Sequence, residues 1–197
     1  MKKILFAALI ALICTGLAAQ EPVLLEGKAR TDAIASILKA NDIRTSLQFD
    51  FVMTRYSALV TDRLESRGRA SFVFPDRVRW EVEQPRASVF VLNGAAPGDR
   101  RQQTLLRNVS KISEKGLINE EDFNVAVYQS PGQWQVDLVP LRRDLSQLFT
   151  RITLLVDPST GALRSVVLNE VGGDMTTLVL SSVKKGLPLG DDLFIQP

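Results

Sequence analysis

The stretch from Ser66 to Pro85 alternates apolar and charged residues with a period of two, the period at which a β-strand presents opposite faces. Its apolar positions are Ala70, Phe72 and Phe74 before a Pro-containing turn, and Val78, Trp80 and Val82 after it. Its charged positions are Arg67, Arg69, Arg77, Arg79, Glu81 and Glu83. We expect two adjacent strands with one apolar and one charged face, and we interpret the charged face as solvated, with the arginines balanced by Glu81 and Glu83. The apolar face covers either a packed core or a cavity.

Similar alternation recurs along the chain. One run includes Leu47, Phe49 and Phe51, and another includes Trp134, Val136 and Leu138. Turns rich in Pro, Gly, Asn and Asp separate these runs, a spacing typical of an antiparallel sheet built from hairpins. A sheet with one solvated face needs a cover for its apolar face.

Two helical segments are available as that cover. Residues 31–42 have apolar side chains at helical spacing, with Thr31 or Asp32 as the expected N-cap and Asn41-Asp42 at the end. Residues 104–117 have a second apolar stripe that stops at Gly116. The predicted fold class is therefore α+β, mostly antiparallel, with a long curved sheet and a helical lid.

The first twenty residues form a separate unit. Lys2 and Lys3 precede the short apolar run 4–13, and small residues follow it, as in a secretory signal peptide. We expect residues 1–20 to be removed and residues 21–197 to form one domain. The precursor has 24 Lys and Arg against 22 Asp and Glu, so removing Lys2 and Lys3 leaves a formally neutral chain. A neutral chain lacks the basic footprint of a nucleic-acid-binding protein.

Missing residue types exclude several chemistries. The chain has no His, and its one Cys, Cys14, lies in the predicted signal peptide. Zinc sites made of Cys and His, and nucleophiles that depend on His or Cys, are therefore excluded from the mature chain. The carboxylates of 120–122 are interpreted as a solvated loop, and Glu170 with Asp174 as an unoriented pair rather than a catalytic acid and base. We expect no enzyme activity, no cofactor and no metal.

Several of these segments, in this order, resemble the periplasmic outer-membrane lipoprotein carrier (LolA) family. They are "SLQFDF", "SRGRASFVFPDRVRWEVEQP", "WQVDLVP", "RITLLVDPSTGALRSVVLNEVGGDMTTLVL" and the late "LF". The resemblance implies an incomplete (half) β-barrel whose concave apolar face is covered by a helical lid. It also implies a periplasmic carrier that shields the acyl chains of lipoproteins, or a related lipid-like cargo, between the inner and outer membranes of a Gram-negative cell.

The chain departs from the family at two places. The best-known carriers have an Arg just before the Pro of the "FP" turn, where it bonds the lid from the cavity side, and this chain has Phe74. The segment 94–103 also replaces a Gly-containing turn that an aromatic strand follows in the family. The chain is therefore identified as a divergent member whose cargo the sequence does not specify.

The predicted site is an acyl-chain cavity under a lid. Its lining residues are Leu47, Phe49, Phe51, Phe72, Phe74, Trp80, Phe90, Trp134, Val136 and Leu138. The lid residues are Ile34, Ile37, Leu38, Leu105, Leu106, Val109 and Ile112. By resemblance, the partners are an inner-membrane ABC-type lipoprotein-releasing transporter and an outer-membrane acceptor, and we expect a monomer. The alternative is a non-enzymatic interaction or structural module of the cell envelope with a filled core.

Overall fold

The computed structural model of the chain describes residues 21–94 and 115–195. In chain order, its elements are β1 (Val23–Leu24), α1 (Gly27–Ala40), β2 (Ser46–Ser57), β3 (Val60–Val73), β4 (Arg77–Gln84), β5 (Ser88–Asn93), β6 (Phe123–Ser130), β7 (Gln133–Pro140), α3 (Arg143–Ser146), β8 (Phe149–Val156), β9 (Leu163–Glu170), β10 (Met175–Lys185) and the 3₁₀ helix η1 (Asp191–Phe194). The predicted segments 94–103 and 104–117 fall largely outside the described residues.

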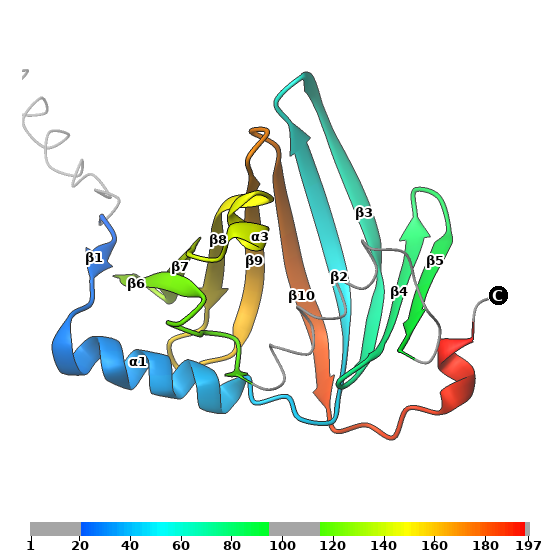
Figure 1. Cartoon of the computed structure of the whole chain (residues 1–197), viewed down its shortest axis with the longest axis horizontal. Coiled ribbons are helices and arrows are strands. Elements are labelled where there is room, and N and C mark those ends of the chain that lie inside the picture. The colour runs from blue at the N-terminus through cyan, green and yellow to red at the C-terminus, as the bar shows by residue number, and fades with distance from the viewer. Residues whose placement is uncertain (1–20, 95–114, 196–197) are drawn as a thin grey trace, which may run out of the picture.

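All ten strands form one antiparallel sheet in the order β1-β6-β7-β8-β9-β10-β2-β3-β4-β5 (Figure 1). The long pairing of β10 with β2 joins the first run of strands to the last. The sheet is open, because β1 and β5 are its two edges and do not pair with each other. The predicted α+β, mostly antiparallel class is confirmed, and the sheet is not closed into a barrel.

The register puts the alternating apolar residues of successive strands on the same face of the sheet. In an antiparallel pair, directly opposite residues point to the same side. The pairs Val136–Leu154, Leu154–Val166, Val166–Leu178, Leu178–Met53, Leu180–Phe51, Phe49–Ala70, Ala70–Trp80 and Trp80–Phe90 therefore share one face. We call it the α1 face, because α1 packs on its β6–β9 end. The parity predicted for β2, β3, β4 and β7 is confirmed.

Helix α1 is buried against β6–β9 through a packed core. Ala33 and Ile37 of the helix join Val127, Val136 and Val156 of the sheet, and all of these side chains are nearly inaccessible to solvent. Ile34 and Leu38 pack at the margin of the same core. Strands β2–β5 lie beyond the C-terminal end of α1 (Figure 1).

The helix begins one turn earlier than the sequence predicted. Its N-cap is Glu26, which makes no side-chain cap hydrogen bond, so the expected caps lie inside the first turns. The Thr31 hydroxyl donates to the carbonyl oxygen of Gly27, and Asp32 pairs with Lys28 one turn back. Hydroxyl and carboxylate side chains serve these helical roles as well as capping, which is why the sequence signal misplaced the start.

The C-terminal end of α1 is fixed to the sheet by Asn41. Its amide nitrogen donates to the carbonyl oxygens of Ile37 and Gly161, each at 2.8 Å. Its amide oxygen accepts the backbone N–H of Leu163 at 3.1 Å. Gly161 has a φ of +71°, and a Cβ there would lie 2.6 Å from a backbone oxygen of α1, so only glycine permits this close approach. Lys185 of β10 also donates to the carbonyl oxygen of Ala40, where a cation favours the helix dipole.

The opposite face of β4 and β5 holds η1, which the sequence did not predict. Phe194 is buried there, with the guanidinium of Arg77 at 5.3 Å from its ring centre, and Arg79 donates to the carbonyl oxygen of Leu193. The expectation that the four arginines face solvent and are balanced by Glu81 and Glu83 is therefore only partly correct. Arg79 pairs with Glu81, whereas the ion-pair partners of Arg67, Arg69 and Arg77 are Glu65, Asp50 and Asp191.

We predict that Asn41→Ala lowers the free energy of unfolding by about 1–3 kcal/mol, because it leaves the buried hydrogen-bonding groups around it without partners. Urea unfolding followed by circular dichroism measures the change. The control is Asn124→Ala, whose side chain is exposed on β6 and whose effect we expect to stay within about 0.5 kcal/mol. Equal losses in the two variants would contradict this role for Asn41.

Candidate apolar binding site

The β2–β5 half of the α1 face has a cluster of aromatic rings. Phe51 stacks on Trp80 with ring centres 4.3 Å apart, and Phe49 meets Trp80 edge-on at 6.4 Å. Phe49 also stacks on Phe72 at 5.9 Å, and Phe72 stacks on Phe74 at 6.1 Å. Each such pair adds about 0.5–1.5 kcal/mol beyond the area it buries, so the rings stabilise one another's positions. We call these five rings, together with Phe90 at their edge, the aromatic cluster.

Gly68 makes room for the closest ring contact. It lies opposite Phe51 in the β2–β3 register and next to a shift in the β3–β4 register. A Cβ at this position would lie 1.8 Å from the carbonyl oxygen of Glu81 and 3.0 Å from the ring of Phe51. Glycine therefore lets Phe51 lie close to the sheet and stack on Trp80.

The two halves of the α1 face are packed to different degrees. Under α1, Val127, Val136 and Val156 have no exposed surface. In the other half only Phe49, Phe51 and Ala70 are buried, while the large side chains around them are partly accessible. These partly accessible residues are Leu47, Met53, Phe72, Trp80, Val82, Leu178 and Leu180. A contiguous set of accessible apolar side chains on a sheet face is typical of a surface that binds something apolar.

The structure divides the ten predicted lining residues between these halves. Leu47 and the six rings of the aromatic cluster lie in the β2–β5 half. Val136 and Leu138 are buried in the core under α1, with Trp134 partly buried beside them. Of the predicted lid residues, Ile34, Ile37 and Leu38 pack on that core, and Leu105, Leu106, Val109 and Ile112 lie outside the described residues.

Phe74, the position where the family resemblance implies an Arg latch, belongs to the apolar cluster. Besides stacking on Phe72, its side chain packs near Val78 and Leu92. Its backbone N–H donates to the carbonyl oxygen of Thr45 at 2.9 Å. The side chain therefore adds apolar surface where an arginine would add a charge.

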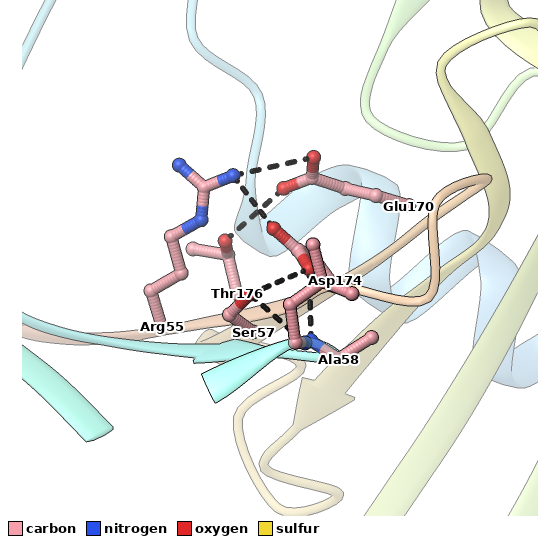
Figure 2. A network of polar contacts seen from close by, with 7 residues as sticks. Arg55, Ser57, Ala58, Glu170, Asp174 and Thr176 are labelled. Carbon is pink, nitrogen blue, oxygen red and sulfur yellow. Dashed lines mark hydrogen bonds and ion pairs between the residues drawn. The ribbon is translucent and has the colours of Figure 1, made fainter. Parts of the chain in front are cut away.

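Glu170 and Asp174 form a structural network and are oriented, contrary to the expectation from sequence (Figure 2). Arg55 lies 2.9 Å from Asp174 and 3.7 Å from Glu170. Asp174 also accepts the backbone N–H of Ala58 at 3.0 Å and the hydroxyl of Ser57 at 3.2 Å. These hydrogen bonds, first that from Ala58 and then that from Arg55, hold the pKa of Asp174 below its ordinary value. A carboxylate held ionised in this way joins two turns of the sheet and is poorly suited to act as a general acid.

The acidic segment 120–122 is engaged in ion pairs. Glu120 pairs with Arg30 of α1, Glu121 with Lys115, and Asp122 with Arg142. Among residues 21–94 and 115–195, no group of His, Cys, Asp and Glu has an arrangement that could hold a metal ion. In the same ranges, no helix is long and apolar enough to cross a membrane.

The fold defines an α+β protein: one open antiparallel sheet with a long helix on one end of one face. No family model matches the sequence, and no curated protein matches it. The chain is similar in structure to a LolA superfamily protein from Nitrosomonas europaea, with a TM-score of 0.42, 11% identity, and 82% of this chain and 97% of that chain covered. It is also similar to an outer membrane lipoprotein-sorting protein domain from Vibrio parahaemolyticus, with a TM-score of 0.38, 11% identity, and 83% and 94% covered.

A third similar structure is the MucA/MucB complex of Pseudomonas aeruginosa, with a TM-score of 0.39 and 13% identity. There, 85% of this chain matches 60% of the other, so the likeness spans less than two thirds of that protein. Identities of 11–13% with TM-scores near 0.4 describe a distant likeness of fold and assign no function.

The Asp174 network generates a prediction about acid pH. The hydrogen bonds lower the folded-state pKa, so their stabilisation is present above the ordinary value of 3.8 and is lost as the pH falls through the lower folded value. In a pH titration followed by NMR, the Ala58 amide resonance should therefore move with a midpoint below 3.8. Arg55→Gln should raise that midpoint, because it removes the second-largest cause of the shift. A wild-type midpoint at or above the ordinary value would contradict the network.

Proposed function

We propose that this chain is a non-enzymatic periplasmic carrier that shields acyl chains of lipoproteins, or of a related lipid-like cargo, on the aromatic half of the α1 face. The observation that carries the proposal is the set of partly accessible apolar side chains around the aromatic cluster. Under the proposal, Trp134, Val136 and Leu138 act as core, and the cargo contacts Leu47, Phe72, Trp80 and their neighbours.

The dimensions of α1 and the sheet support this division. A helix of 14 residues is about 21 Å long, whereas ten strands span about 43 Å from edge to edge. The described helix therefore covers about half of the α1 face. The other half has room for an extended apolar ligand or for a further apolar segment.

The energetics suit a carrier of acyl chains. Each buried methylene contributes about 0.8 kcal/mol, so a long chain laid across aromatic rings gains on the order of 10 kcal/mol relative to water. Flat rings bind such a chain through dispersion and loss of hydrated surface, neither of which depends on a fixed geometry. A surface of this kind accepts acyl chains of different lengths and gives little selectivity among them.

The anchoring of α1 bears on how cargo enters. Arg30 bonds Glu120 and the carbonyl oxygen of Val125 near its start, and Asn41 holds its end. Ile37 is fully buried between these two anchors. Under the proposal α1 is a fixed wall of the site and not its movable lid. The alternative, an envelope interaction module with a filled core, fits the α1 half and leaves the accessible rings of the other half without a role.

We predict that the chain recovered from a periplasmic extract carries acyl lipid or lipoprotein, identified by mass spectrometry. Phe72→Glu should lose this cargo while remaining folded, because Phe72 is only partly buried and a carboxylate there opposes apolar contact. Leu154→Ala, under α1, should lower stability by about 2–5 kcal/mol and retain cargo per folded molecule. The carrier proposal fails if the wild-type chain holds no acyl compound.

The chain's two tryptophans allow the site to be located directly. Trp80 belongs to the aromatic cluster and Trp134 to the core under α1. A brominated fatty acid quenches indole fluorescence on contact, so it should quench Trp80 in a Trp134→Phe variant and leave Trp134 unaffected in a Trp80→Phe variant. Equal quenching of both, measured by fluorescence titration, would place the cargo elsewhere.

A further inference from the structure

The end of the sheet opposite η1 has exposed aliphatic side chains on three neighbouring segments. Leu59 at the β2–β3 turn is 93% exposed, and Val171 at the β9–β10 turn and Leu148 after α3 are also exposed. Both turns lie at one end of the sheet and η1 lies at the other (Figure 1). We call the three segments 57–59, 171–174 and 141–148 the hairpin end.

The three segments are contiguous in space. The backbone N–H of Val171 donates to the carbonyl oxygen of Leu148 at 3.1 Å. A Cβ on Gly173 would lie 3.2 Å from the Cβ of Ala58, so the β9–β10 turn touches the residue before Leu59. The exposed side chains thus belong to one rim. Leu64, also exposed, continues this rim along the α1 face, because it pairs with Arg55 in the β2–β3 register.

Charge at this rim is positive where it is not internally neutralised. Each described carboxylate there has a cation partner: Arg55 pairs with Asp174 and Glu170, and Arg142 with Asp144. Arg63 and Arg143 are exposed and have no carboxylate partner among the described residues. The guanidinium of Arg63 lies 4.9 Å from the ring centre of Tyr56, which puts a phenol next to the apolar tip.

The mounting of the rim is rigid. Arg55, Ser57 and the Ala58 backbone converge on Asp174, as Figure 2 shows, and this network ties the β2–β3 hairpin to the β9–β10 turn. Leu59 follows directly on the clamped residue Ala58. A fixed apolar tip loses less conformational entropy on burial than a flexible one.

We propose that the hairpin end docks on the surface of an anionic phospholipid bilayer. Leu59, Val171 and Leu148 enter the interface between headgroups and acyl chains, where aliphatic side chains are stabilised by leaving water. Tyr56 lies at headgroup level, as tyrosine does in membrane proteins, and Arg63 and Arg143 pair with lipid phosphates. This interaction concerns a lipid surface and is separate from acyl cargo on the aromatic half of the α1 face.

Co-sedimentation with vesicles tests the proposal on the full chain as it is secreted and recovered. We expect binding to vesicles of phosphatidylcholine with phosphatidylglycerol, weaker binding to phosphatidylcholine alone, and a decrease in added salt, because exposed charges are screened. Leu59→Glu should lower the partition coefficient about tenfold or more, since it replaces an inserting leucine by a like charge to the lipid. Arg63→Gln combined with Arg143→Gln should remove most of the preference for anionic vesicles.

The matched control is Ile195→Glu, an exposed aliphatic residue after η1 at the opposite end, which should bind vesicles like the wild type. Both variants also show whether a retained apolar segment 4–13 causes the binding, because such a segment would mask the effect of Leu59→Glu. Phe72→Glu should keep vesicle binding, which separates this proposal from the carrier function. The proposal is overturned if the wild type shows no preference for anionic vesicles, or if Leu59→Glu binds them as the wild type does.

Discussion

The packing of α1 on β6–β9 is the interaction on which the rest of the structure depends. A ten-stranded sheet with one apolar face needs a cover about twice as long as a 14-residue helix. The helix is fixed at one end of that face, with Ile37 at the centre of the contact and Asn41 at its terminus. Every difference between the two halves of the sheet follows from this placement.

Under the helix, small branched side chains fill the space and exclude water, as expected of a core packed to the density of protein interiors. Beyond the helix, aromatic rings take over the same face and support one another through stacking. Rings of this size keep much of their apolar surface next to the sheet even when nothing is packed on top of them. The β2–β5 half is thus ordered by its own side chains and remains accessible on its outer side, which is what a reusable apolar binding surface requires.

Polar interactions at the ends of the strands determine the shape of the rim. At one end, Asp174 collects hydrogen bonds from two strands and a turn. At the other, Asp157 closes the β8–β9 turn, and the Ser159 hydroxyl, Arg164 and the Ser159 backbone N–H hold its pKa well below the ordinary range. On the far face, Arg77 and Arg79 bind η1 through a ring and a carbonyl oxygen. These contacts fix turns and termini that hydrophobic packing alone leaves free to move.

The strands and their parities could be predicted because both depend on neighbours two residues apart. Phe49 and Phe51, or Trp134 and Val136, must share a face in any strand that contains them. The start of α1 was harder, because Thr31 and Asp32 are good caps that here serve inside the helix. The role of Phe194 could not be foreseen, since its partner Arg77 lies more than a hundred residues away and looks like an ordinary solvated arginine.

The sequence by itself determined an antiparallel α+β chain with one apolar face and no His- or Cys-based chemistry, because these properties follow from residue types and from local periodicity. Only the tertiary structure decided which part of that face is core and which part is accessible. That division depends on where a single helix of limited length comes to rest on a wide sheet, a choice made by long-range packing. The same packing brought Leu59, Leu148 and Val171 together at one rim, although they are separated by up to a hundred or so residues of chain.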